Sequence, residues 1–341
     1  MKRLIILVFC FPLVLFSQIG GTSSYNSLNL NSSSRVLAMG GEVISVMDND
    51  VSLANMNPSL MNLGMSGQMS FNFVDYVSDI NFISFHTSKK IGENFFLFTG
   101  IDAVNYGKFE NTDEIGNYLG EFSAHEQVFT IGGAKYLGSN FTLGSNIKIL
   151  NSQLETYHSL AISSNIGVTY NLIEKHFTTS FLLKNIGSPI TYYSSEKENL
   201  PFEVQLGVSK SLKHLPFRYS LVFHHLNIYD LSNDFYPNTI YNPETNEVEI
   251  KEETVAKKML RHLIVVGELT PFKKNFYLRG GFNFQRREDL KLSTRNSMVG
   301  FSFGLGFKIS KFHFNYSRSA FHTSSMLNSF SILTNLSTFG L

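Results

Sequence analysis

The sequence predicts an all-β protein: a membrane-spanning antiparallel β-barrel of about fourteen strands, preceded by an amino-terminal plug or hatch segment. Three observations lead to this fold class. Apolar residues alternate with small or polar residues in segments of roughly ten residues, the length of a tilted strand that crosses a bilayer. The chain has 32 Phe and 15 Tyr, whereas charged residues make up only 16% of it. Short and long connections between these segments alternate along the chain, with one exception.

The alternation is clearest in residues 301–309, where Phe, Phe, Leu, Phe and Ile occupy the odd positions. A strand points successive side chains to opposite faces, so one face of this segment is apolar and the other is mostly small or polar. Segments of this type, some with weaker alternation, recur along the chain. The predicted strands are residues 68–75, 79–87, 94–105, 126–137, 140–150, 160–170, 176–186, 201–209, 217–228, 261–269, 275–285, 296–309, 311–318 and 328–339.

The first eighteen residues have the pattern of a secretory signal peptide. Lys2 and Arg3 precede an apolar run over residues 4–16, which is too short to span a bilayer comfortably. The single cysteine, Cys10, lies in this run, and the bulky Phe9 before it disfavours lipoprotein processing. A mature chain without cysteine excludes disulfides, thiol catalysis and cysteine-based metal sites.

Residues 19–67 differ from the rest of the chain and are predicted to form the plug. Residues 34–41 resemble a short capped helix that two glycines end. Residues 48–50 and the pair Asn57–Pro58 are typical of turns. The barrel domain is then expected over residues 68–341.

Charge is distributed unevenly between the short and the long connections. The short ones carry lysines such as Lys89 and Lys175, whereas the long ones, over 106–125 and 229–258, are rich in carboxylates. Outer-membrane barrels have short periplasmic turns and longer external loops, so we expect the carboxylates at the cell surface. Either they are ordinary solvated residues, or they dock a basic or metal-bridged partner. The candidate docking residues are Glu110, Asp113, Glu114, Asp230, Asp234, Glu244, Glu247 and Glu249.

Five basic residues fall on the predicted polar face of the strands. A charge on the lipid face costs roughly 2–4 kcal/mol near the bilayer midplane, so these side chains are expected to point into the lumen. They are Lys148, Lys184, Arg218, Arg279 and Lys308.

No catalytic, cofactor or metal site is predicted. A net charge of +1 does not indicate the strongly basic surface that is typical of nucleic-acid-binding proteins. His224 and His225 are adjacent on a predicted strand, so they should point to opposite faces and be unable to share an ion. His158 and Ser159 remain a candidate pair for a hydrolase, although no orienting carboxylate or amide can be assigned to them.

The plug segment resembles the signature of the PorV/PorQ family, a branch of the FadL-like outer-membrane barrels. The similarity lies in Ser-Arg-Val-Leu-Ala-Met-Gly-Gly at 34–41, Asp-Asn-Asp at 48–50 and Asn-Pro-Ser-Leu at 57–60. Ser34 and Ser59 stand where the family usually has Ala. Residues 18–21, 105–109, 113–117 and 120–124 resemble the PorQ branch in particular. The matching motif residues are Ser34, Arg35, Gly40, Gly41, Asp48, Asp50, Asn57 and Pro58.

The resemblance implies a fourteen-stranded barrel with an amino-terminal hatch, in the outer membrane of a Bacteroidetes-type bacterium. It implies a non-enzymatic component of the type IX secretion system, in the attachment complex that processes secreted cargo and links it to lipopolysaccharide. The implied partners are a PorZ-like surface protein, a PorU-like sortase and a PorV-like shuttle. The alternatives are a FadL-like passive transporter of hydrophobic compounds and an enzyme such as a lipid deacylase.

Overall fold

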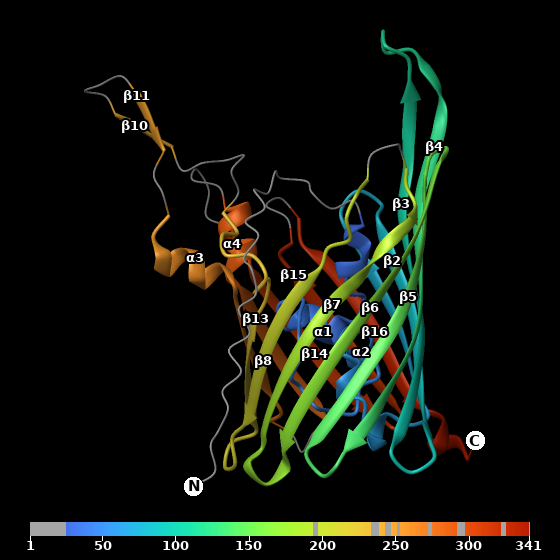
Figure 1. The fold of residues 1–341 in the computed structure, drawn as a ribbon, viewed down its shortest axis with the longest axis vertical. Helices are drawn as coiled ribbons and strands as arrows, with labels where there is room; N and C mark the ends of the chain where they lie inside the picture. Colours follow the sequence, from blue (N-terminus) through green and yellow to red (C-terminus); the bar gives the residue numbers. More distant parts are fainter. Residues whose placement is uncertain are drawn as a thin grey trace, which may run out of the picture.

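The described residues of a computed structural model form a closed barrel of fourteen antiparallel strands (Figure 1). The structure describes residues 25–193, 197–232, 239–242, 247–250, 253–271, 275–291, 297–321 and 325–340. Each strand of the barrel pairs with its neighbours in the chain, and β1 closes the barrel against β16 from Gln68↔Asn335 to Asp75↔Asn328. The predicted fold class is therefore confirmed, and the predicted signal peptide, residues 1–18, lies outside the described residues.

The barrel strands differ more in length than the sequence indicates. They are β1 (Gln68–Asp75), β2 (Asn81–Ile91), β3 (Phe95–Thr112), β4 (Tyr118–Leu137), β5 (Phe141–Leu154), β6 (Tyr157–Leu172), β7 (Phe177–Thr191), β8 (Glu203–Ser211), β9 (Phe217–Phe223), β12 (Leu263–Leu269), β13 (Phe276–Asn283), β14 (Phe301–Ile309), β15 (Phe312–Ser319) and β16 (Leu327–Asn335).

Several predicted boundaries are wrong. The predicted strand over 296–309 begins only at Phe301, and the one over 328–339 ends at Asn335, where η5 (Leu336–Phe339) follows. The predicted loop over 106–125 is mostly a continuation of β3 and β4, because the two strands stay paired up to Thr112↔Tyr118. The predicted strand over 217–228 ends at Phe223. The end of the predicted strand over 275–285 turns into helix α4 (Phe284–Leu290), which the side chain of Asn283 caps by accepting the Arg286 N–H.

The strands have an apolar outer face and a lumen lined by small and polar residues. In β14, Phe301, Phe303, Leu305 and Phe307 expose 40–48% of their surface, whereas Ser302 is fully buried. Long strands such as β5 and β6 and short strands such as β16 show the same alternation. A closed sheet satisfies every strand edge, and an apolar outer ring suits acyl chains, so this is the architecture of a transmembrane barrel.

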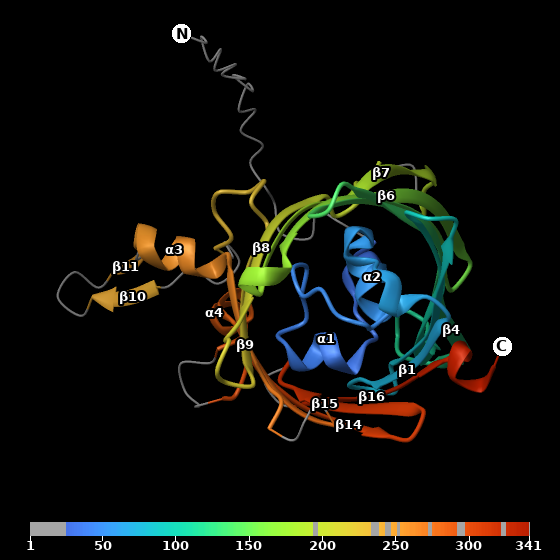
Figure 2. The same ribbon diagram turned by 90° about the horizontal axis from the view of Figure 1, so that it is seen from below.

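The amino-terminal segment, residues 25–67, lies inside the barrel (Figure 2). It contains η1 (Asn26–Asn29), α1 (Ser34–Ala38), α2 (Ser52–Met56), η2 (Pro58–Leu60) and η3 (Leu63–Met65). Buried side chains of this segment, among them Val36, Met39 and Leu53, form the main apolar core with lumen-facing residues of the strands. The core thus sits between the segment and the wall.

Among the described residues, no helix is both long enough and apolar enough to cross a membrane.

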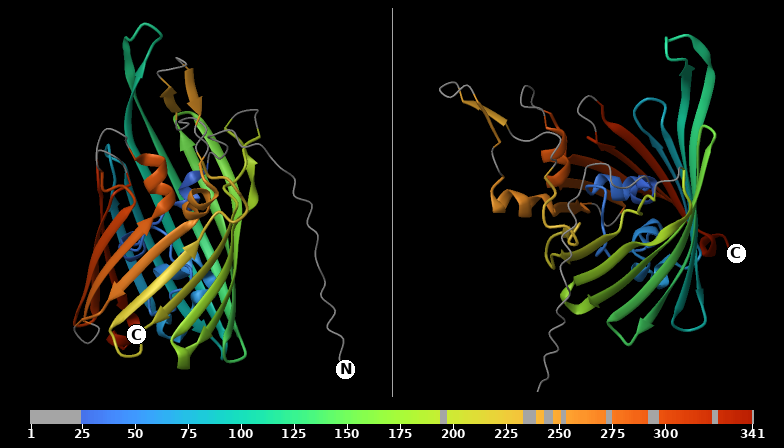
Figure 3. Two further views of the ribbon diagram at one scale, coloured as in Figure 1. Left: turned by 90° about the vertical axis from the view of Figure 1, so that its left-hand side faces the viewer. Right: turned by 45° about the horizontal axis from the view of Figure 1, so that its top comes forward.

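The barrel wall has two unequal halves (Figure 3). The tall wall consists of β3 to β7, which have 14 to 20 residues each. The low wall consists of β8, β9, β12 to β16 and β1, which have 7 to 9 residues each. Strand β2, with 11 residues, lies between the two walls, since it pairs with β1 and β3. Short turns join the strands at one end of the barrel, here named the short-turn end. At the opposite, long-loop end, the β3–β4 hairpin extends beyond the rest of the barrel, and α3 (Val255–Arg261) and α4 lie above the low wall (Figure 1).

Candidate functional site

Helix α1 and the turn after it rest on the low wall. Glycines of the strands make room for this contact. A Cβ atom at Gly281 of β13 would overlap the backbone N of Gly40, and one at Gly304 of β14 would overlap the Cβ of Ala38. Gly40 and Gly41 themselves have φ values of +89° and +97°, a conformation that glycine adopts without strain. The glycine pair therefore lets the chain turn sharply against the wall.

The segment that follows packs on the tall wall through neutral polar groups. Asn57 caps η2, because its Oδ1 accepts the Ser59 N–H at 3.1 Å, and Pro58 occupies the first helical position. The Ser59 hydroxyl contacts Thr169 Oγ1 of β6 at 2.7 Å. Asn165 Nδ2 donates to the Met56 carbonyl at 3.1 Å. A Cβ at Gly144 or at Gly167 would overlap Ser59 or Asn57, so both strands approach this turn closely.

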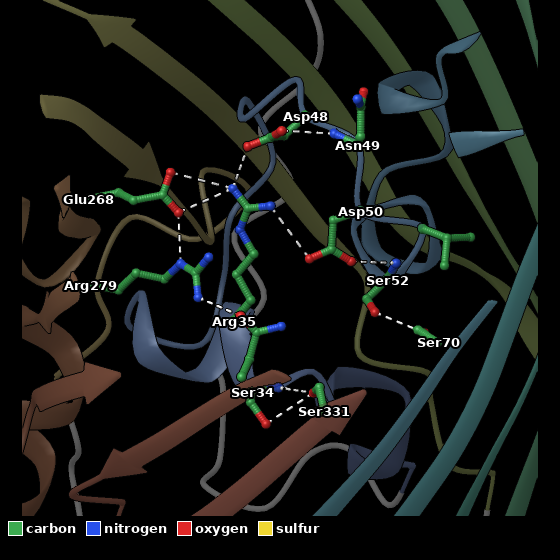
Figure 4. A network of polar contacts seen from close by, with 12 residues as sticks. Ser34, Arg35, Asp48, Asn49, Asp50, Ser52, Ser70, Glu268, Arg279 and Ser331 are labelled. Carbon is green, nitrogen blue, oxygen red and sulfur yellow. Dashed lines mark hydrogen bonds and ion pairs between the residues drawn. The ribbon is translucent and has the colours of Figure 1, made fainter. Parts of the chain in front are cut away.

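Arg35 is the centre of a buried network of charges (Figure 4). It is only 5% exposed, and its guanidinium lies 2.6 Å from Asp48 Oδ2, 3.5 Å from Asp50 Oδ2 and 3.1 Å from Glu268 Oε2. Asp50 also accepts the Ser52 N–H at 3.0 Å, and Asp48 accepts the Asn49 N–H at 2.8 Å. These contacts fold the turn over residues 48–50 back onto α1.

Two further arginines join the network from the low wall. Arg279 Nε donates to Glu268 Oε2 at 2.7 Å, and Arg218 pairs with both Glu268 and Asp48. Among the described residues, the network thus joins three guanidinium groups to three carboxylates. Buried charges persist only when they are paired, so removing one partner is expected to be costly.

The structure brings part of the motif residues of the plug together on the low wall, whereas Asn57 and Pro58 lie against the tall wall. Arg35, Asp48 and Asp50 are mutual partners, and Gly40 and Gly41 shape the turn against β13. Ser34 donates its backbone N–H to Ser331 Oγ of β16 at 2.9 Å. Sequence reasoning missed Glu268, since an acidic residue at an inward position of a strand gives no local sign of its partner.

The part of the chain that the structure describes encloses an outer and an inner cavity in the lumen, on opposite sides of α1. The outer cavity has a volume of about 350 Å³, lies at the long-loop end and has a largely apolar lining. Its apolar lining includes Leu30, Leu37, Val74, Phe82, Phe321 and Leu327. The inner cavity has a volume of about 510 Å³, lies at the short-turn end and is polar. Its polar lining includes Arg35, Asp48, Asp50, Arg279, Lys308 and His313.

Helix α1 separates these cavities. Leu37 lines the outer cavity and Arg35 lines the inner one. Residues two apart on a helix point about 200° away from each other, which explains how one short helix faces both spaces. A solute that passed from one cavity to the other would have to get past α1 and the Arg35 network.

Arg286 of α4 gives the outer cavity one cationic group. Its guanidinium lies over the Phe321 ring at 3.4 Å from the centroid, and its Nη2 donates to the Gly40 carbonyl at 3.3 Å. Within the described part of the chain, its Nη1 has no hydrogen-bond partner. The cavity therefore combines a largely apolar lining with a cationic group that can bind an anionic or polar end of a ligand. The carboxylates of Glu42 and Asp289 also line it.

Most of the basic residues predicted to face the lumen do so. Lys148, Lys184 and Arg279 are 2–7% exposed, and Lys184 pairs with Glu42 and Glu203. Arg218 belongs to the Arg35 network. Lys308 is exposed at the end of β14 and lines the inner cavity.

The two histidine hypotheses are both wrong in their geometry. Ser159 is buried and bonded to the Tyr25 hydroxyl at 2.6 Å, whereas His158 is exposed on the other face of β6, so the two do not form a catalytic pair. His224 and His225 do not point apart, because β9 has already ended and His225 has a φ of +53°. Their Nδ1 atoms lie 2.6 Å apart.

The acidic residues predicted to dock a partner have mixed surroundings. Glu110, Asp113 and Glu114 lie on the β3–β4 hairpin, on the opposite side of the barrel mouth from β10 (Thr239–Asn242) and β11 (Glu247–Ile250), where Glu247 and Glu249 lie (Figure 2). Asp113 accepts the N–H groups of Asn117 and Ile115, and these hydrogen bonds lower its pKa. Asp230 pairs with Lys258 at 2.5 Å. Asp234 and Glu244 lie outside the described residues.

Comparison with solved structures identifies the fold. The toluene transporter TbuX of Ralstonia pickettii is 12% identical, with a TM-score of 0.54 over 90% of this chain and 99% of that chain. The monoaromatic hydrocarbon channel CymD is also 12% identical, with a TM-score of 0.54 over 90% and 98% of the two chains. A FadL homologue of Pseudomonas aeruginosa is 11% identical, with a TM-score of 0.49 over 89% and 98%.

No protein-family model and no curated protein sequence matches the chain. The comparisons therefore bring no support for the PorV/PorQ branch in particular. The similar structures are named as transporters and channels rather than enzymes. At this low sequence identity, the similarity shows only that the fold is shared. The chain has the same fold as TbuX and CymD, a closed antiparallel β-barrel, here of fourteen strands.

Proposed function

We propose that this chain is an integral barrel of a Gram-negative outer membrane that lets small hydrophobic compounds cross passively. The outer cavity carries this proposal, because it is an open space inside the barrel with a largely apolar lining, whereas the lining of the inner cavity is polar. Its volume is at the lower end of the range of small-molecule sites, which favours small ligands. The fold shared with TbuX and CymD supports the same class of function.

The orientation follows from the loops. Outer-membrane barrels have short turns on the periplasmic side, so the outer cavity and the β3–β4 hairpin would face the cell surface. The low wall offers an entry route for a solute into the outer cavity. Strands β9 and β12 have 7 residues each, fewer than the roughly 9–11 residues that a tilted strand needs to cross a bilayer. The outer cavity, which His224 at the end of β9 helps to line, would then lie close to the lipid surface.

Helix α1 would act as the hatch. It divides the two cavities, so passage needs α1 and the Gly40–Gly41 turn to move away from the low wall. The Arg35 network would hold the hatch closed, and its contacts to Asp48 and Glu268 would have to open or rearrange during passage.

Uptake of labelled toluene and of a medium-chain fatty acid by cells that express this chain tests the proposal. Leu30→Trp should fill the outer cavity and reduce uptake several-fold, because Leu30 lines it and is 38% exposed. Leu63→Trp is the matched control, since Leu63 is 62% exposed on η3 and lines neither cavity. Uptake that equals that of cells without the protein, or that Leu30→Trp leaves unchanged, would contradict it. A difference between the two solutes would show whether Arg286 favours an anionic end.

A second candidate function is the anchoring of a surface partner, as the PorV/PorQ resemblance implies. The β3–β4 hairpin favours it. Its tip exposes Ile115 at 85%, Tyr118 at 62% and Leu119 at 63%, and such exposed apolar side chains are typical of contact surfaces. The partner would be a PorZ-like protein of a type IX attachment complex.

A pull-down from outer membranes in mild detergent tests this second function. Replacing Ile115, Tyr118 and Leu119 together by Ser should release the partner and leave the barrel folded. If no type IX component co-purifies with the unmodified chain, or if the triple variant still retains it, the anchoring function fails.

A further inference from the structure

We propose that Glu203, His224 and His225 form a binding site for a divalent transition-metal ion, with Zn²⁺ as the best match. The three residues each offer a ligand atom at one point of the barrel rim. His225 Nδ1 lies 3.4 Å from Glu203 Oε1, and His224 Nδ1 lies 4.0 Å from the same oxygen. The two Nδ1 atoms are 2.6 Å apart.

These separations suit a tetrahedral ion. Ligand bonds of about 2.0–2.1 Å around a tetrahedral Zn²⁺ place neighbouring ligand atoms roughly 3.3 Å apart. The observed distances lie on both sides of this value, so small rotations of the rings would bring the three ligand atoms to the separations that Zn²⁺ requires. Two imidazoles and one carboxylate are also a donor set that Zn²⁺ accepts in three-ligand sites, with the fourth position open.

The backbone explains why neighbouring residues converge. The β9 ladder ends at Phe223, and the left-handed conformation of His225 turns its ring back towards His224. The first residue of β8, Glu203, faces this bend, and its Oε1 accepts the His225 backbone N–H at 3.2 Å. The site thus joins the start of β8 to the end of β9.

Surrounding groups hold the Glu203 carboxylate in place. Lys184, its cross-strand neighbour on β7, donates to Oε2 at 3.3 Å, and Gln205 Nε2 donates to Oε1 at 2.7 Å. Both donors also contact Glu42 of the amino-terminal segment, at 2.9 Å and 2.7 Å. Such outer partners orient metal ligands in proteins. Glu42 supplies a second negative charge beside the cationic Lys184.

The ring of His224 is buried, and its two nitrogens have different surroundings. Its side chain is 2% exposed, and within the described residues its Nε2 has no hydrogen-bond partner. When Nδ1 of a neutral imidazole binds an ion, Nε2 carries the proton, so this nitrogen has no partner with or without the ion. The ion would instead replace the close contact between the two Nδ1 atoms, which are 2.6 Å apart.

The open position would face the outer cavity, which His224 and His225 both line. A bound ion would therefore tie β8 to the segment after β9 at the rim of the low wall, next to the space assigned to the solute. The site does not depend on the proposed transport, since its test measures metal alone.

The test uses the full chain in detergent, purified without a polyhistidine tag, stripped with a chelator and then given Zn²⁺. Elemental analysis after gel filtration should find about one zinc per chain, and X-ray absorption should find two imidazoles and oxygen around it. His225→Asn removes one ligand while keeping a residue that tolerates positive φ. We expect it to weaken zinc binding by more than the 10–100-fold that outer partners contribute. His158→Asn is the control, because His158 is exposed on the other face of β6.

His224→Ala serves as a second variant, with circular dichroism to check that the barrel is folded. Zinc that the wild type does not retain would overturn the proposal and leave a hydrogen-bonded histidine pair. Equal zinc in the wild type and both folded variants would overturn it as well, since the ion would then lie elsewhere. Loss of zinc from His158→Asn alone would do the same.

Discussion

The tall wall and the low wall follow the same sequence rule but serve the amino-terminal segment differently. Along both, small and polar side chains point inward and large apolar ones point outward. The 20 residues of β4 extend over about 68 Å along the strand, whereas the 7 residues of β12 extend over about 24 Å. The tall wall therefore rises beyond a bilayer of ordinary thickness, whereas the shortest strands of the low wall are shorter than its hydrocarbon core of roughly 30 Å.

The contacts to the amino-terminal segment also differ between the walls. The turn at residues 57–59 contacts the tall wall through neutral groups, as in the pair Ser59–Thr169, whereas α1 contacts the low wall through charges, as in the pair Arg35–Glu268. The segment also forms one ion pair with the tall wall, between Glu42 and Lys184 of β7. The difference indicates that the turn at residues 57–59 is fixed by neutral hydrogen bonds, whereas α1 on the low wall is held by charges that can exchange partners.

The largest expected effect comes from Arg35→Met. It leaves Asp48, Asp50 and Glu268 with fewer buried partners, so docking of residues 34–50 should weaken by about 3–5 kcal/mol. Thr169→Val on the tall wall should weaken docking by only about 1 kcal/mol, because it removes neutral hydrogen bonds. Hydrogen exchange of the segment measures both. Equal losses of docking free energy in the two variants would remove the distinction between the walls. Arg318→Ala, on the exposed face of β15, is the control for the loss of a positive charge.

A lysine on the outer surface locates the bilayer on the tall wall. Ile147 is 51% exposed in β5, and Ile147→Lys should destabilise the barrel by roughly 2–4 kcal/mol if it faces the bilayer midplane. Leu119→Lys, near the tip of the hairpin, should cost about 0–1 kcal/mol because it lies outside the membrane. Denaturant unfolding in lipid vesicles compares the two, and a large cost at Leu119 would mean that the hairpin is embedded.

A smaller effect is expected from a matched pair of glycines on β13. Gly281→Val should force the Gly40 backbone away from the low wall and cost about 1–3 kcal/mol of segment docking. Gly280→Val should have little effect on docking, since its Cβ would meet no atom closer than 3.9 Å. Limited proteolysis of the amino-terminal segment distinguishes them. If both variants are cut at the wild-type rate, α1 does not press on β13.

The smallest effect concerns α3 above the low wall. Hydrogen bonds from Arg261, and also from Lys257, lower the pKa of Glu253 to about 2. A lowered pKa stabilises the folded state above the unfolded pKa of about 4.3, and the contribution is lost as pH falls towards 2. Amides of α3 should therefore exchange faster at pH 3 than at pH 7, after correction for intrinsic rates. Glu253→Gln should abolish this difference, and a difference that persists in it would assign the effect to another group.

The sequence predicts the barrel well because strand alternation is a local property. Residues 301–309 show both faces of β14 without any knowledge of neighbours. Strand ends were harder to predict, since pairing decides them. The hairpin beyond Asn105 is held by β3–β4 pairing, and β9 stops before His224 although the pattern continues.

The site could be predicted only in part. The motif residues Arg35, Asp48 and Asp50 were singled out through the family resemblance, but their partner Glu268 lies more than two hundred residues away. The convergence of His224 and His225 depends on one left-handed residue, and the sequence gives no sign of it. The outer cavity arises from the low wall, whose height the strand predictions did not capture.

The most direct test of the account locks α1 to the wall. The Oγ atoms of Ser34 and Ser331 lie 3.0 Å apart, so Ser34→Cys with Ser331→Cys should form a disulfide between α1 and β16. The single native cysteine, Cys10, lies in the predicted signal peptide. Ser317→Cys with Ser329→Cys, whose Oγ atoms are 2.5 Å apart on β15 and β16, is the control within the wall. If α1 is the hatch, toluene uptake through the oxidised Ser34–Ser331 variant falls to background and returns on reduction, while the control keeps its uptake. Equal uptake in the oxidised and the reduced variant would contradict the account.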